Sequence, residues 1–263
     1  MSGDDPLCIL WQTPDLVAVE KPAGLATIPG RGETDSMLQR LGRQLGIRSA
    51  GQADPRVRVL HRLDKETSGV LLFALNRPAQ QHLSHQFQNN TVRKEYLALV
   101  RGRPPQSEGE IDAALAPHPS NPRRMAVVKH GGRPARTDWR IEESFRGFTL
   151  IRCFPKTGKT HQIRVHLAHV GMPLAIDPLY ARPSQPGSRD PGRPARTGVF
   201  LSEFKRDYRP NRGEEERPLI VRLTLHAEKL AFVNLDGTAV EIVASLPKDF
   251  RATLNQLRRH GRR

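Results

Sequence analysis

Two short apolar runs enclose a polar turn in the first third of the chain. Val59 and Leu60 form the first run, and residues 70–75 form the second. Such runs on either side of a polar connection are typical of two buried strands. Asp64 lies between them, on a connection anchored at both ends, where a fold can expose a group and still fix its position. Asp64 could equally close an ordinary turn, because Asp and Ser-Gly favour turns.

The remaining pattern mixes helices and strands. Amphipathic or capped stretches predict helices at residues 34–46, 78–90, 160–170 and 249–257. Shorter apolar or alternating runs predict a hairpin at 7–21 and strands at 94–100, 111–115, 124–128, 135–141, 148–153, 219–227 and 241–244. In the third helix, Ile163, Leu167 and Val170 are expected to share one apolar face.

Charge adds the strongest compositional signal. The 263 residues include 42 Lys and Arg against 27 Asp and Glu, a net charge of +15. A positive field of this size favours polyanions, nucleic acid above all. Aromatic residues are only 5%, which argues against a base-stacking platform such as an RNA-recognition motif. We find no basic amphipathic helix with a bulky apolar face, so we expect no membrane partner.

Several other classes are not expected. No apolar run approaches the length of a membrane-spanning helix, and the N-terminus lacks a secretory signal. Cys8 and Cys153 alone cannot form a disulfide framework, so a reducing cytoplasm is the simplest setting. His82 and His85 lack a third metal ligand nearby. Residues 157–160 (Thr-Gly-Lys-Thr) lack the spacing of an ATPase phosphate loop.

Five stretches of the chain resemble the RluA-type RNA pseudouridine synthases, and one of them is residues 94–96 (Lys-Glu-Tyr), which match the family's Lys-x-Tyr. Residues 61–70 contain Arg-Leu-Asp followed by Thr-Ser-Gly, which is similar to the signature around the family's catalytic aspartate. Residues 21–24 (Lys-Pro-Ala-Gly) are similar to a turn near the start of the family's catalytic domain. Residues 158–166 and 222–227 resemble two later signatures, although Lys159 stands where the family usually has arginine. Met172 and residues 175–177 (Ala-Ile-Asp) also depart from the commoner pattern of the family.

The resemblance implies a role for five residues. Asp64 would be the catalytic residue, and Arg164 would be the arginine that pairs with it and keeps it ionised in an apolar cleft. Tyr96 would lie against the target base, and Ile163 would form part of the apolar floor beneath that base. Arg62 would fill the space left by a flipped base. From its position alone, Arg62 could also pair with Asp64.

The resemblance also implies the fold. We expect an α+β protein with a largely antiparallel sheet, bent around a central cleft, and with packed helices. Residues 1–263 would form a single catalytic domain, with no S4-type RNA-binding domain before the first strand. The Arg/Pro-rich residues 182–217 would be an insertion that serves either as an RNA clamp or lid or as a flexible linker. Residues 258–263 would be a basic tail.

The predicted activity is the isomerisation of specific uridines in structured RNA (rRNA or tRNA) to pseudouridine. The reaction involves no redox change and no leaving group, so we expect no cofactor and no metal. The carboxylate of Asp64 would either attack the nucleotide or assist removal of the 2′-proton, and Tyr96 or water would remove the C5 proton. We expect RNA to be the partner of a cytoplasmic monomer.

Two other functions would account for part of the pattern. A non-catalytic RNA-binding protein or RNA chaperone on the same fold would explain the charge equally well, but not the occurrence of Arg62, Asp64, Tyr96 and Arg164 in the order of the family. A glycoside hydrolase would need two carboxyl groups, such as Asp64 and Glu66, on either side of one bond. A pI of about 10.8 is unusual for an enzyme with a neutral sugar substrate.

Overall fold

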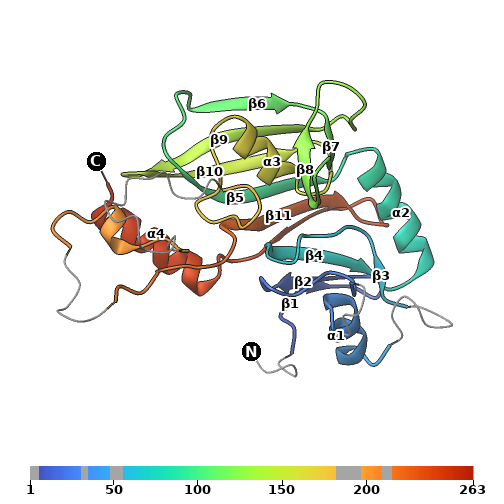
Figure 1. Cartoon of the computed structure of the whole chain (residues 1–263). Helices are drawn as coiled ribbons and strands as arrows, with labels where there is room; N and C mark the ends of the chain where they lie inside the picture. The colour runs from blue at the N-terminus through green and yellow to red at the C-terminus, as the bar shows by residue number, and fades with distance from the viewer. Residues whose placement is uncertain (1–5, 31–34, 48–55, 182–196, 209–214, 263) are drawn as a thin grey trace. The chain divides into compact units, whose positions relative to one another are not determined.

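The computed structural model describes residues 6–30, 35–47, 56–181, 197–208 and 215–262 (Figure 1). The chain divides into two compact units. The first unit comprises Met1–Tyr96 and His226–Ser245, and the second comprises Leu97–Leu225 and Leu246–Arg263. Each unit is described by itself.

The first unit is organised around one fully buried strand. Its strands are bonded in the order β1 (Ile9–Gln12), β2 (Leu16–Lys21), β4 (Ser68–Ala74) and β11 (Leu225–Val233), with β3 (Arg58–Val59) on β4 and β12 (Ala239–Val243) on β11. The pairing of β4 with β11 is parallel, and the others are antiparallel. Because every residue of β4 is buried, this strand is the centre of the unit.

The two helices of the first unit cover opposite faces of the strands. They are α1 (Met37–Gln44), capped by the side chain of Ser36, and α2 (Arg77–Gln88), capped by that of Asn76. Successive side chains of a strand point to opposite faces. In β4, Leu71 and Phe73 share a core cluster with residues of α1, and Val70, Leu72 and Ala74 share another with residues of α2.

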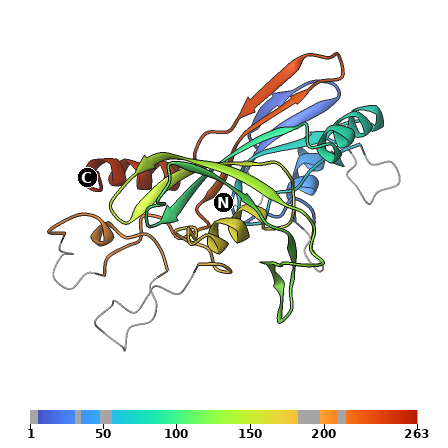
Figure 2. The same ribbon diagram turned by 90° about the horizontal axis from the view of Figure 1, so that it is seen from above.

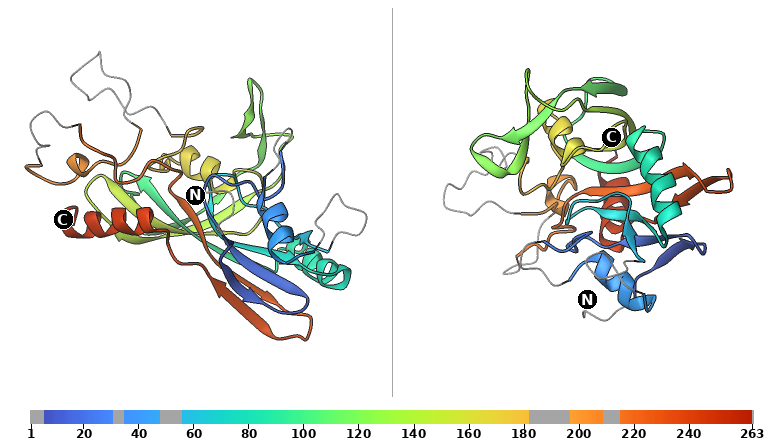
Figure 3. Two further views of the ribbon diagram at one scale, coloured as in Figure 1. Left: turned by 90° about the horizontal axis from the view of Figure 1, so that it is seen from below. Right: turned by 90° about the vertical axis from the view of Figure 1, so that its right-hand side faces the viewer.

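The second unit contains a run of four bonded strands, in which β9 is antiparallel to both of its neighbours, and a separate hairpin. Its strands follow the order β5 (Arg93–Arg101, which enters this unit at Leu97), β10 (Phe148–Pro155), β9 (Arg136–Ser144) and β6 (Glu108–Asp112). Strands β7 (Leu115–His118) and β8 (Asn121–Val127) form a two-stranded hairpin of their own. Figures 2 and 3 show this hairpin projecting away from β9 and β10.

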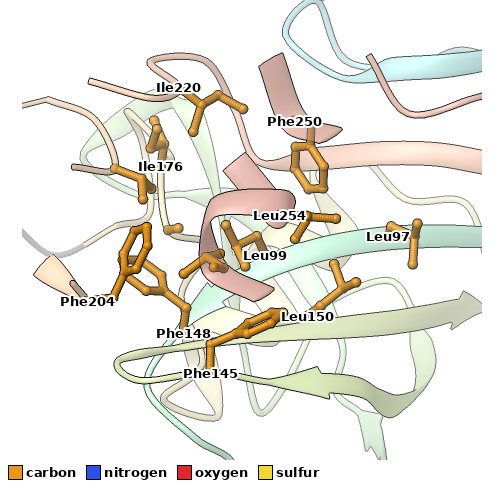
Figure 4. Packing of buried hydrophobic residues seen from close by; sticks show 13 residues of the cluster. Leu97, Leu99, Phe145, Phe148, Leu150, Ile176, Phe204, Ile220, Phe250 and Leu254 are labelled. Atoms are coloured by element: carbon orange, nitrogen blue, oxygen red, sulfur yellow. The ribbon is translucent and has the colours of Figure 1, made fainter. Parts of the chain in front are cut away.

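Three helical segments complete the second unit: α3 (Gln162–His169), the 3₁₀ turn η1 (Leu201–Glu203) and α4 (Lys248–His260). Residues from α4, the strands and the connecting segments form the main core cluster of this unit, in which Phe148 meets Phe204 edge to face at 6.2 Å (Figure 4). In α3, all residues from Gln162 to Leu167 are buried. None of the described helices has the length and apolar character needed to cross a membrane.

The structure confirms the α+β class, the mostly antiparallel strands and the four predicted helices. Val170 was wrongly placed on the buried face of α3: it is 44% exposed, because the helix ends at His169 and Val170 lies beyond it. The bend of the sheet, the central cleft and the single domain remain predictions. Residues 182–196 and 209–214 of the predicted insertion, and residue 263 of the predicted tail, lie outside the described residues.

The strand predicted at 219–227 was wrong in its first part, since β11 begins only at Leu225. The preceding residues bond to another segment instead. The Leu219 amide donates to the Val199 carbonyl at 2.8 Å, and the Val199 amide donates to the Ile220 carbonyl at 3.1 Å.

Replacing Leu254 of α4 by alanine should weaken the second unit. Leu254 is fully buried in the main cluster, and truncating a buried leucine costs about 2–5 kcal/mol. Urea denaturation followed by circular dichroism should show this loss. The control Arg251→Ala, at an exposed position of the same helix, should change the free energy of unfolding by less than about 0.5 kcal/mol. Equal stability of the two variants would contradict the core assignment.

Candidate active site

Asp64 lies on the connection between β3 and β4, as predicted, and is partly buried. Its carbonyl accepts a hydrogen bond from the Thr67 amide at 3.0 Å. This bond closes a turn directly after Asp64. The carboxylate therefore stands on a short, closed loop just before the buried strand β4.

A buried lysine ties this loop to the end of β2. Lys21 is fully buried, and its Nζ donates to the carbonyls of Pro22 at 2.8 Å, Leu25 at 2.6 Å and Lys65 at 2.8 Å. An ammonium group has three protons to donate, and burying it is costly unless they are satisfied. Its three carbonyl partners meet this requirement. Because one of them belongs to the residue after Asp64, Lys21 also fixes the position of the loop.

The segment that follows Lys21 makes further bonds on both sides of Asp64. The Thr27 hydroxyl accepts from the Leu63 amide at 3.2 Å and donates to the Leu63 carbonyl at 3.1 Å. The Gly24 amide donates to the Lys65 carbonyl at 2.9 Å. Gly24 has φ +87, a conformation that glycine adopts without strain. The residues before and after Asp64 are thus bonded to the same turn.

The far end of the loop is fixed against β11. The Ser68 hydroxyl lies 2.9 Å from Nδ1 of His226, whose Nε2 lies 3.1 Å from the Ala244 carbonyl. A carbonyl can only accept, so Nε2 carries the proton, and Nδ1 accepts from Ser68. A Cβ on Gly69 would stand 2.0 Å from the Ala227 carbonyl oxygen. Only glycine permits this approach of β4 to β11.

His61 supports the start of the loop as a neutral side chain. Its Nε2 accepts from the Leu72 amide at 3.1 Å, and its ring stacks on Phe87 with centroids 4.9 Å apart. Burial, with a further contribution from the charge of Lys94, lowers the pKa of His61 to about 3. The imidazole therefore stays uncharged near neutral pH and can keep accepting the backbone proton.

Tyr96 is close enough to Asp64 to respond to its charge. The ring packs against the core cluster that contains Leu63 and Leu71. Burial raises the pKa of Tyr96, and the negative charge of Asp64 raises it further. The phenol is therefore protonated at neutral pH. It can donate or accept a hydrogen bond as it stands, but it can act as a base only after losing its proton.

Arg62 lies two residues before Asp64 on the same loop. It is exposed, and within the described ranges no ion pair joins it to Asp64. Its predicted role of filling the space of a flipped base therefore stays a prediction.

Ile163 and Arg164 lie side by side in α3 of the second unit, with 6% and 4% exposure. Arg164 forms a two-point ion pair with Asp177, in which Nε and Nη2 each donate to a carboxylate oxygen at 2.8 Å. Such fork-to-fork pairs fix the plane of the guanidinium group. The predicted pairing of Arg164 with Asp64 and the predicted contact of Ile163 with the base remain predictions.

The described residues contain no group of three or more His, Cys, Asp or Glu placed to hold a metal ion. His82 lies with Nε2 3.0 Å from the Val233 carbonyl, and His85 lies 2.9 Å from the Asn89 side chain. Both histidines on α2 thus have hydrogen-bond partners within the first unit.

Comparison with known proteins identifies the family. Residues 15–169 match the RNA pseudouridylate synthase family. The chain belongs to this family. It is 45% identical over 179 residues to the ribosomal large subunit pseudouridine synthase D of Nitrosomonas europaea. This alignment covers 68% of this chain and 51% of that relative. It is 36% identical over 259 residues to the protein of the same name from Haemophilus ducreyi, covering 96% of this chain and 71% of that relative.

Solved structures agree with the predicted fold. The human RNA pseudouridylate synthase domain containing 4 superposes with a TM-score of 0.70 and 25% identity, covering 95% of this chain and 93% of that one. The human RNA pseudouridylate synthase domain containing 1 gives 0.66 and 26%, covering 94% and 86%. The predicted family and fold are therefore confirmed. The matched stretch spans about half the length of the Nitrosomonas relative.

Three residues that support the side chains described above were not singled out from the sequence as site residues. Lys21 was predicted only as part of a turn, Asp177 was noted only for its departure from the common family pattern, and His226 only as part of a strand motif. Their roles depend on partners far along the chain, such as Ser68 for His226. The one signal available for Lys21 was its position at the end of β2, two residues after the apolar run of residues 16–19.

Replacing Lys21 by methionine should impair catalysis more than RNA binding. Methionine has a similar length but no proton to donate, so the bonds from Nζ to the three carbonyls are lost and the loop carrying Asp64 should shift. A displacement of about 1 Å at a reacting group can cost about 100-fold in rate. We expect a loss of this size in kcat, measured by pseudouridine formation in RNA.

The matched control is Lys229→Met. Lys229 also lies in the first unit, but it is partly exposed and pairs with Glu241 on the neighbouring strand. This variant should keep the wild-type kcat. If Lys21→Met were as active as Lys229→Met, the anchoring role of Lys21 would be wrong.

Proposed function

We propose that this chain isomerises uridines of ribosomal RNA to pseudouridine, with Asp64 as the catalytic residue. The observation that carries the proposal is the fixed loop of Asp64 in a chain of the pseudouridylate synthase family. Tyr96 lies near enough for the charge of Asp64 to raise its pKa. Ribosomal RNA is preferred to tRNA because the relatives from Nitrosomonas and Haemophilus are named for the large ribosomal subunit.

The chemistry requires one bond to break and another to form within the same nucleotide. The bond between N1 and C1′ breaks, the base turns, and C5 bonds to C1′. The C5 proton leaves, and N1 gains a proton, so the product is an isomer of the substrate. The Asp64 carboxylate either bonds covalently to the nucleotide or assists loss of the 2′-proton. We expect Arg164 to keep this carboxylate ionised and Ile163 to contact the base.

The role of Tyr96 follows from its protonation state. Because its pKa is raised, the phenol at neutral pH is a hydrogen-bonding group against the base rather than a ready phenolate. Water, or Tyr96 after transfer of its own proton, would then take the C5 proton. Arg62 is exposed beside the loop, and we expect it to occupy the space left by the flipped base.

Electrostatics supports RNA as the substrate. The net charge is +15, and residues 113–137 contain no Asp or Glu. This stretch includes the β7–β8 hairpin and Arg123, Arg124, Lys129 and Arg133. A run of cations without compensating acids attracts phosphates. We infer that the hairpin contacts the RNA backbone and that the protein acts as a monomer in the cytoplasm.

Asp64→Asn tests the catalytic assignment. The amide keeps the size of the side chain but cannot act as a carboxylate, so the rate should fall at least about 1,000-fold, as expected when a catalytic group is removed. RNA affinity should be nearly unchanged, since phosphate contacts dominate it. The assay is pseudouridine formation in large-subunit rRNA, with a tRNA pool in parallel. Glu66→Gln, two residues away, is the matched control and should stay active.

The outcomes separate the alternatives. Full activity of Asp64→Asn would refute the catalytic role of Asp64. Modification of tRNA alone would keep the activity but correct the substrate. Tight RNA binding by the wild-type protein without any pseudouridine would favour a non-catalytic RNA-binding protein.

A further inference from the structure

The carboxylate of Asp177 organises the surroundings of Arg164. Its side chain is fully buried. Besides the two bonds from Arg164, the Oδ1 atom accepts from the backbone amides of Leu179 at 2.9 Å and Tyr180 at 3.2 Å. Four donors thus converge on one carboxylate, which leaves it little freedom to turn. The guanidinium plane of Arg164 is fixed by a group that is itself fixed.

Tyr180 forms a second support for the same guanidinium. The Cζ of Arg164 stands 5.2 Å from the ring centroid, and the Cζ of Arg124 also stands 5.2 Å from it. A cation over an aromatic ring is attracted by the ring's negative face. The Tyr180 hydroxyl accepts from the Met125 amide at 2.7 Å and lies 2.8 Å from Nδ1 of His161. The ring is therefore held at its edge while it supports Arg164.

These contacts join three separate parts of the second unit. Arg164 belongs to α3, Asp177 and Tyr180 to the segment after it, and Arg124 and Met125 to β8 of the projecting hairpin. Asp177 restrains the guanidinium within its plane, and the Tyr180 ring, over which the guanidinium lies, adds a second contact. A side chain with many rotamers is thus confined before any RNA is bound.

We propose that Asp177 and Tyr180 are positioning residues for Arg164, and that the β7–β8 hairpin shares this task through its contacts with Tyr180. The inference depends on the proposed function, in which Arg164 keeps Asp64 ionised. It adds that the arginine is effective only while Asp177 and Tyr180 hold it in place. It also adds that the seating of the hairpin influences the rate, and not only the binding of RNA.

Tyr180→Leu tests the support given by the ring. The variant keeps an apolar side chain but loses the contact with both guanidinium groups. We expect kcat to fall roughly 100-fold, as for a misplaced reacting group, with KM for rRNA within about 3-fold of wild type because RNA affinity comes mainly from phosphate contacts. The acid limb of the kcat–pH profile should move to higher pH, because a less fixed Arg164 lets Asp64 take up a proton more readily.

Two further variants test separately the contribution of the Tyr180 hydroxyl and that of the Asp177 carboxylate to the position of Arg164. Tyr180→Phe keeps the ring and removes only the oxygen that bonds to the hairpin, so it should fold, with kcat lowered about 10-fold and the acid limb moved in the same direction. Asp177→Asn keeps the size of the side chain but removes the charge that pairs with Arg164, so kcat should fall because the guanidinium is no longer fixed. Circular dichroism and thermal unfolding should establish that each variant is folded.

Matched controls come from the same unit. Asp249→Asn breaks a comparable two-point pair, in which Arg222 donates to Asp249 at 2.7 and 2.9 Å. Tyr208→Leu removes a ring that lies 5.8 Å from the Nζ of Lys205. Both controls should keep the wild-type kcat and pH profile.

The inference is overturned if folded Tyr180 and Asp177 variants keep the wild-type kcat and acid limb. It is also overturned if the Tyr180 variants lose activity without any movement of the acid limb, since a purely structural role would produce that result. The variant Arg164→Ala distinguishes a failure of this inference from a failure of the proposed function. If it keeps full activity while Asp64→Asn is inactive, the role of Arg164 and this inference fail, but the proposed function stands. If Asp64→Asn is fully active, the catalytic assignment of Asp64 fails.

Discussion

The buried ammonium of Lys21 is the constraint on which the first unit depends. A charge enclosed in an apolar core needs all its donors satisfied, and Lys21 meets this need with three backbone carbonyls. Two belong to the turn after β2, and the third belongs to Lys65 in the loop of Asp64. The two segments are 44 residues apart in the sequence. Burying the lysine side chain therefore requires the turn after β2 and the loop of Asp64 to lie next to each other.

The other contacts of the loop follow from this junction. Thr27 bonds to Leu63 on one side of Asp64, and Ser68 bonds to His226 on the other. The loop then passes directly into β4, whose close approach to β11 at Gly69 leaves no space for a side chain. The carboxylate is thus placed by bonds to its neighbours and by the strand that follows. This arrangement suits a catalytic group, which must keep its geometry without being enclosed.

Local patterns were enough to predict the loop of Asp64, the four helices and most strands. They depend on apolar spacing and caps within a few residues, such as Ser36 before α1. The anchors could not be predicted, because a lysine next to proline and glycine looks like part of a solvated turn. Arg164 illustrates the same limit. Its partner Asp177 is 13 residues away, beyond the end of α3, and no spacing rule connects the two. The wrong start of β11 had a similar cause, since Leu219 and Ile220 bond to Val199.

Amide hydrogen exchange of the loop, compared between the wild-type protein and Lys21→Met, tests the anchoring role of Lys21 most directly. The relevant amides are those of Gly24 and Thr67, which donate to the carbonyls of Lys65 and Asp64. Exchange reports how often such bonds open. If Lys21 holds the loop, both amides exchange slowly in the wild type and much faster in the variant, while the Leu72 amide in β4 keeps its protection. Unchanged protection of Gly24 and Thr67 in a folded Lys21→Met protein would contradict the account.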